Sequence, residues 1–193
     1  VGKWNAMVDL LKEQLDRYSD EEVDEKTLVH LEMIDIYKNK LNAPAKVVAS
    51  WQAILEISPS NVQALDALAS EYTEMKRWPD LVKVLAQKVE HEIDPKRLVA
   101  LHKQIANIHQ EKFNNANEAI KSWEAILELE PDNREALKTL KDIYEQRRDY
   151  DNLVAVSERE LDLVTDEKKR FKQLVDLAKM ASEKLRKPQT PIA

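Results

Sequence analysis

The four histidines are the residues of this chain best suited to bind a metal or to move a proton near neutral pH. His102 and His109 are seven positions apart and could share a helix face. No HExxH pair and no carboxylate at ligand spacing accompanies them. His30 lies 72 positions before His102, and this regular spacing favours a packing role. We therefore expect no metal site, no cofactor and no catalytic residue.

The composition excludes several classes of enzyme. Phosphate-binding loops, dinucleotide-binding turns and nucleophile elbows need glycines, and the chain has only Gly2. Thiol nucleophiles, disulfides and thiolate zinc sites need cysteine, which is absent. We expect a protein that is not an enzyme. With 43% hydrophobic and 34% charged residues, the chain is typical of an all-α fold with solvated outer faces.

The stretches that would position functional residues occur twice. Residues 51–78 and 123–150 share eleven identical residues, and the members of each pair are 72 positions apart. Trp51 and Trp123 belong to this set and lie on apolar stripes with helical spacing. Core packing is therefore the expected role of both rings. An internal duplication of this kind is typical of a helical solenoid.

Apolar spacing, prolines and N-cap residues predict ten helices joined by short loops. The helices are expected at about residues 3–18, 26–39, 44–57, 62–76, 79–92, 96–112, 116–130, 133–147, 150–164 and 167–186. Eight of them pair into repeat hairpins over residues 26–57, 62–92, 96–130 and 133–164. The first and the last helix, residues 3–18 and 167–186, are half-hairpins. We expect one domain over residues 1–186 and a tail or severed linker over residues 187–193.

The segment 133–162 resembles a tetratricopeptide repeat, a two-helix unit of about 34 residues. The family's first-helix pattern is matched by Leu137, Leu140 and Tyr144. The resemblance extends over residues 4–185. It implies an α-solenoid of stacked antiparallel hairpins with a right-handed superhelical course, cut from a longer array. Some of the family's small positions hold larger residues, which predicts wider or irregular helix spacing: Ile34, Val47, Leu81, Lys141 and Leu153.

In this family the first helix of each repeat lines a concave groove, so the resemblance implies that a partner protein segment binds there. The groove residues expected on this basis are Asp35, Lys38, Asp66, Ser70, Lys103, Gln104, Asn107, Lys138, Asp142 and Lys172. Four further residues share the same faces: Asn39, Gln63, Gln110 and Glu135. One subset of the family clamps a C-terminal carboxylate, and Lys103, Asn107 and Lys172 match that clamp. Thr139 and Asp176 depart from it. A solvated helix face is the alternative for all these residues.

The charge distribution argues against nucleic acid as a partner. Residues 1–96 hold 18 acidic and 12 basic residues, and residues 97–193 hold 18 of each, so no basic stripe is present. No apolar run is long enough to span a membrane, and the first ten residues lack the order of a signal peptide. We expect a cytoplasmic protein, or an extracytoplasmic one if a signal precedes this sequence.

Two functions fit these observations. The first is a non-enzymatic adaptor, a scaffold whose groove holds a segment of a partner protein. The second is a structural spacer or self-assembly segment of a large repeat protein. The half-hairpins 3–18 and 167–186 each leave an apolar face uncovered, which predicts self-association through the ends.

Overall fold

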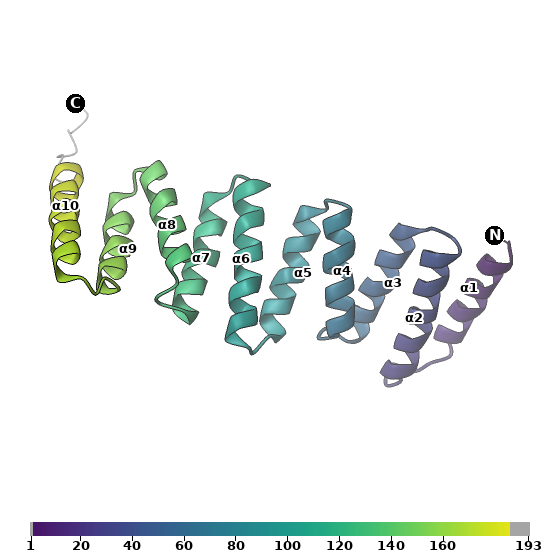
Figure 1. Cartoon of the computed structure of the whole chain (residues 1–193). Coiled ribbons are helices and arrows are strands. Elements are labelled where there is room, and N and C mark those ends of the chain that lie inside the picture. The colour runs from purple at the N-terminus through teal and green to yellow at the C-terminus, as the bar shows by residue number, and fades with distance from the viewer. Residues whose placement is uncertain (1, 186–193) are drawn as a thin grey trace, which may run out of the picture. The chain divides into compact units, whose positions relative to one another are not determined.

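The computed structural model describes residues 2–185 of the 193 in the sequence, and within that range it contains ten α-helices and no strand (Figure 1). The helices are α1 (Gly2–Leu15), α2 (Val23–Asn39), α3 (Pro44–Ile57), α4 (Val62–Glu74), α5 (Trp78–His91), α6 (Pro95–Glu111), α7 (Ala116–Leu129), α8 (Arg134–Arg147), α9 (Tyr150–Asp162) and α10 (Glu167–Leu185). The all-α prediction and the pairing of helices into hairpins are confirmed. The tail predicted for residues 187–193 lies outside the described residues.

The helix starts follow from the local sequence. Pro44 and Pro95 occupy the first turns of α3 and α6, where a missing N–H removes no helical hydrogen bond. Asn61 and Asn133 cap α4 and α8, and their Oδ1 atoms accept from the N–H groups of Ala64 and Ala136. The largest differences from the predicted ends are at α1, which stops at Leu15, and at α2, which begins at Val23.

The turns after the first helices contain residues with a left-handed backbone conformation that are not glycine. Asn42 and Asn114 follow α2 and α6, and Lys76 and Arg148 follow α4 and α8, all with φ between 48° and 58°. Both pairs are 72 positions apart, so the duplication extends to the backbone. Asparagine tolerates this conformation, whereas lysine and arginine adopt it at a cost.

The chain forms two compact units, residues 1–92 and residues 93–193. The first unit comprises α1–α5, and its core includes Ile54, Leu68 and Leu85. The second comprises α6–α10, and its core includes Trp123 and Leu140. The assignment of residues 1–186 to a single domain stays a prediction, as does the hand of the superhelix.

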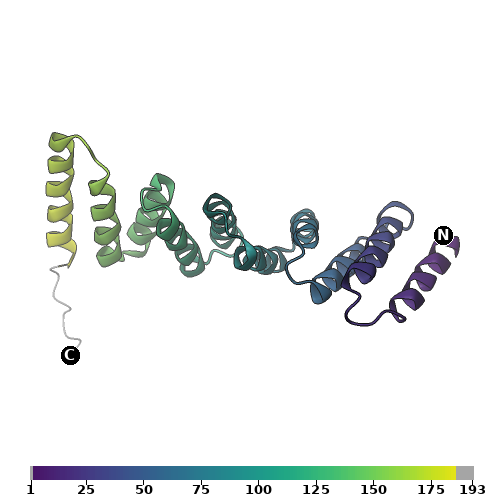
Figure 2. The same ribbon diagram turned by 90° about the horizontal axis from the view of Figure 1, so that it is seen from below.

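Within each unit, only helices that follow one another in the sequence approach closely (Figures 1 and 2). In residues 2–92, for example, α3 and α5 both pack on α4 but have no Cα atoms within 8 Å of each other. The same holds for α8 and α10 in the described part of the second unit, which both pack on α9. This arrangement agrees with the wide helix spacing expected from the large residues at the family's small positions.

Candidate functional site

The first helices of the second unit present a row of polar side chains. On α6, Gln104 is exposed while Lys103 and Asn107 are half-buried, and on α8, Lys138 and Asp142 are exposed. The opposite faces of the two helices are buried in the core of the unit. The structure thus places these five predicted residues on the solvent sides of successive first helices.

An ion pair joins these two helices. Lys103 Nζ lies 2.7 Å from Glu135 Oε2, and the two side chains are 44% and 56% exposed. The pair bridges α6 and α8, so the same sides of both helices face a common surface. Because both groups remain exposed, a charged ligand can compete for either of them at small cost.

Most of the predicted groove residues of the first unit interact with neighbouring side chains. Asp35 Oδ1 accepts a hydrogen bond from Asn39 at 2.7 Å. Lys38 Nζ lies 3.7 Å from Glu71 Oε1 of α4. Asp66 forms an ion pair with Lys88 of α5 at 2.6 Å. Ser70 and Gln63 are exposed on α4.

The second unit has a cavity of about 260 Å³ between α8 and α10, above α9. Lys141 and Glu160, which form an ion pair, contribute to its lining together with Gln173 and Asp176. The predicted groove residue Lys172 is exposed on α10 but does not line this cavity. A carboxylate at Asp176 makes the cavity unsuitable for an anionic ligand group.

The two repeated tryptophans are core residues, as predicted. Trp51 and Trp123 are 8% and 2% exposed. The indole N–H of Trp123 donates to Oε1 of Gln110 at 2.9 Å. Gln110 was expected on the groove face, and the structure shows that its side chain also satisfies a buried donor.

Three of the four histidines, His30, His102 and His109, are partly buried, whereas His91 is exposed. Burial lowers the pKa of His30 and of His102, and the nearby carboxylates of Glu56 and Glu128 offset this only in part. His30 and His109 each have a buried Nδ1 atom without a hydrogen-bond partner. Within residues 2–185, no cluster of histidine, cysteine and carboxylate side chains has the geometry of a metal site.

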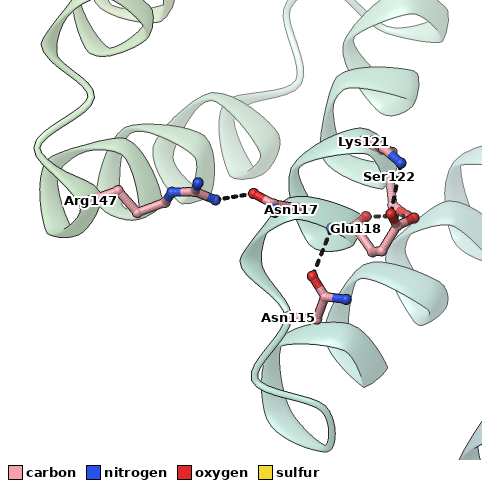
Figure 3. A network of polar contacts seen from close by, with 6 residues as sticks. All are labelled: Asn115, Asn117, Glu118, Lys121, Ser122 and Arg147. Atoms are coloured by element: carbon pink, nitrogen blue, oxygen red, sulfur yellow. Dashed lines mark hydrogen bonds and ion pairs between the residues drawn. The ribbon is translucent and has the colours of Figure 1, made fainter.

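A polar network surrounds the start of α7 (Figure 3). Asn115 Oδ1 caps the helix by accepting from the N–H of Glu118, and Glu118 forms an ion pair with Lys121. Arg147 of α8 donates to Oδ1 of Asn117. The Ser122 hydroxyl donates to the carbonyl of Glu118, so no base activates it. The network holds α7 against α8 and has no catalytic arrangement.

A groove on the second helices of the first unit was not predicted from the sequence. It has a volume of about 580 Å³ and is formed by α3, α4 and α5. The one available signal was divergence within the duplication. Gln52, Lys83 and Gln87 line the groove, whereas their equivalents 72 positions later are Glu124, Ala155 and Arg159. Neither the helix periodicity nor the family pattern marks these positions.

A comparison with family models matches residues 136–171 to a model described as "Tetratricopeptide repeat". The curated proteins gave no match. None of the helices within residues 2–185 combines the length and the hydrophobicity that a membrane span requires.

Several solved structures are similar to this chain at low sequence identity. A structure titled "Crystal structure of MamA protein" is 16% identical, with a TM-score of 0.46 over 88% of this chain and 98% of that one. YrrB, titled "a TPR protein with an unusual peptide-binding site", is 10% identical, with a TM-score of 0.45 over 84% and 79%. Pseudomonas aeruginosa PilF is 14% identical, with a TM-score of 0.44 over 93% and 85%.

Proposed function

We propose that the chain is a tetratricopeptide repeat protein and a non-enzymatic scaffold, which binds a segment of a partner protein on the first helices of its second unit. The binding face consists of Lys103, Gln104 and Asn107 on α6 and Lys138 and Asp142 on α8. Repeat folds of stacked hairpins offer such faces to extended or helical segments.

The observation that carries this proposal is the exposed ion pair between Lys103 and Glu135. It bridges α6 and α8 and so brings the polar sides of two successive first helices onto one surface. Lys138 lies on that surface, is exposed, and forms no ion pair among residues 2–185. The face therefore offers hydrogen-bond donors and a free cation, which favour a segment with carbonyl or carboxylate acceptors.

The absence of catalysis is part of the proposal. The serine hydroxyls that are buried in the second unit donate to carbonyls of their own helices, Ser122 to Glu118 and Ser157 to Leu153. The glycine-dependent phosphate sites and cysteine chemistry are excluded by composition. What remains on the surface is a set of polar side chains suited to recognition.

Charge reversal on the two helix faces tests the assignment. A partner is first isolated with the purified chain as bait, and its affinity is then measured by calorimetry for two double variants. Lys103→Glu with Lys138→Glu should raise the Kd roughly tenfold, because charged groups on a recognition surface each contribute about 1 kcal/mol or less. The control, Lys121→Glu with Arg159→Glu, makes the same charge change on α7 and α9 and should leave the Kd unchanged.

The residues changed in the control form the same number of ion pairs as the residues changed on the proposed binding face. Lys103 and Lys121 each form one exposed ion pair, with Glu135 and Glu118 respectively. Lys138 and Arg159 form none among residues 2–185. If only the α7 and α9 changes weaken binding, the second helices are the working face. If the chain captures no specific partner at all, it serves as a spacer.

A further inference from the structure

The groove on the second helices of the first unit is an apolar depression with polar walls. Leu68 and Tyr72 of α4 form its floor, and Leu55 of α3 and Val84 of α5 form the apolar parts of its walls. The space exists because α3 and α5 each pack on α4 and not on each other. Its volume of about 580 Å³ is typical of sites that enclose several groups of a ligand.

The rim of this groove is acidic. Glu56, Asp80 and Glu90 contribute three carboxylates to the lining, against the single cation of Lys83. Asp80 is already paired with Arg77 at 2.8 Å, whereas Glu90 forms no ion pair among the described residues. The surrounding unit is also negatively charged, since residues 1–92 hold 17 acidic and 11 basic residues, which gives a net charge of −6. The groove therefore suits an apolar ligand group with basic residues beside it.

The last helix of the described chain has these properties. Phe171 and Leu174 of α10 are 69% and 50% exposed. Together with the exposed Ala178 they occupy positions i, i+3 and i+7, which share one face of a helix. Leu177 and Met180, which line the cavity above α9, lie on the other side of α10. The apolar stripe thus faces away from the core of the second unit.

Basic residues border the stripe. Lys168, Lys172 and Lys179 are exposed and form the neighbouring row on α10. The helix as a whole holds six basic and three acidic residues. Helix α1 also exposes apolar side chains, Met7 and Leu10, but its 14 residues carry two basic and two acidic side chains. The charge of the groove therefore favours α10 over α1 as its ligand.

We propose that the groove between α3 and α5 binds helix α10 of a second copy of this chain. Phe171 and Leu174 enter the apolar floor, and Lys168 and Lys172 face Glu56 and Glu90. The two surfaces are different, so each copy can bind one neighbour at its groove and another at its α10. Such a contact is heterologous and builds open chains of copies. It uses neither α6 nor α8, and therefore does not depend on the partner face proposed above.

Sedimentation equilibrium of the full chain over a concentration series tests this contact. The average mass of the unchanged protein should rise with concentration, and it should fall again as sodium chloride is added. Phe171→Asp with Leu174→Asp should weaken self-association roughly a hundredfold, because the two side chains would be the central apolar contacts. Both side chains are exposed, so the fold should be retained, and circular dichroism checks that it is.

Charge reversal in the groove provides the second arm. Glu56→Lys with Glu90→Lys should weaken self-association about tenfold. The matched control is Glu128→Lys, at the position equivalent to Glu56, with Glu158→Lys; it makes the same charge change at exposed positions on α7 and α9 of the second unit. The control should leave self-association unchanged. Equal weakening by the control would mean that net charge, and not the groove, is responsible, and would overturn the proposal.

A mixing experiment separates this contact from a symmetric one. The α10 variant keeps an intact groove, and the groove variant keeps an intact α10. Each should stay monomeric alone at concentrations where the unchanged protein assembles, and their mixture should form a 1:1 complex that grows no further. A mixture that stays monomeric would show that the groove and α10 do not bind each other, whereas a groove variant that still self-associates alone would show a like-to-like contact between α10 helices; either result would refute the proposal. An unchanged protein that is a monomer at all concentrations would equally refute the proposal.

Discussion

Replacing Trp123 by alanine measures how much the repeated core stabilises the second unit. The side chain is 2% exposed and lies in a cluster with Ile126, Leu127 and Leu140. Deleting a buried tryptophan side chain typically costs about 3–5 kcal/mol of unfolding free energy. The change also leaves the Gln110 carbonyl without its indole donor, which adds up to about 1 kcal/mol. We expect a total loss of about 3–6 kcal/mol of unfolding free energy.

The duplication allows the hydrogen bond to be measured separately. Trp51 is the equivalent tryptophan, but Lys38 stands where Gln110 stands in the second copy, and the Trp51 indole has no acceptor among residues 2–185. Trp123→Phe removes the ring nitrogen and its hydrogen bond, whereas Trp51→Phe removes the nitrogen alone. We expect Trp123→Phe to cost about 1 kcal/mol more than Trp51→Phe.

Urea unfolding followed by far-ultraviolet circular dichroism gives these free energies, since helices that share a core unfold together. A double-mutant cycle of Trp123→Phe with Gln110→Met should show a coupling of about 1 kcal/mol. A loss below about 1 kcal/mol for Trp123→Ala would mean that the ring does not fill the core, and the packing described above would be wrong.

Three further predictions concern the turns and the titrating groups. Lys76 and Arg148 have a left-handed backbone conformation, so Lys76→Gly and Arg148→Gly should each raise the unfolding free energy, measured in urea, by up to about 1 kcal/mol. Asn114→Gly should be nearly neutral, because asparagine tolerates this conformation. A lower unfolding free energy for Arg148→Gly would contradict this. Burial holds the pKa values of His30, His102 and His109 below their ordinary value, so the folded state binds fewer protons and stability should fall as the pH drops from about 7 to 5. Replacing the three histidines by glutamine should make the urea midpoint of unfolding depend less on pH over this range. An unchanged pH dependence would rule the histidines out as its cause. Burial, and then the hydrogen bond to Glu124, raise the pKa of Tyr144, while burial raises the pKa of Tyr72. In an ultraviolet titration these two phenols should therefore ionise at a higher pH than free tyrosine, and Tyr144→Phe and Tyr72→Phe should remove that late part of the titration; a titration that the two changes leave unaltered would contradict this.

The helices and their core faces could be predicted because they depend on local signals. The apolar spacing, Pro44 and Pro95, and the caps at Asn61 and Asn133 act within one helix turn of their own positions. The duplication then predicted that the two tryptophans occupy equivalent buried positions. The polar sides of α6 and α8 followed from the same periodicity, since a residue opposite a buried stripe must face solvent.

The groove on α3 and α5 depends on distances between helices that are not neighbours in the sequence. Wide gaps of this kind lie over α4 and over α9 in the described part of the chain, and only the three-dimensional structure shows which side chains line them. The hydrogen bond from Trp123 to Gln110 could not be predicted for a related reason. The helix periodicity places Gln110 toward the groove face, but its length lets the amide reach Trp123 on the next helix. Helix spacing and side-chain reach are tertiary properties that a single sequence does not specify.

Site-specific photo-crosslinking tests the central claim, that a protein segment binds the first helices of the second unit. A photoreactive amino acid is placed at Asn107 on α6 or Asp142 on α8, and at Glu124 on α7 or Ala155 on α9 as controls. The first two positions should cross-link to the same partner segment in the native cell extract, and the latter two should not. Cross-links confined to Glu124 and Ala155 would contradict the account and place the binding face on the second helices.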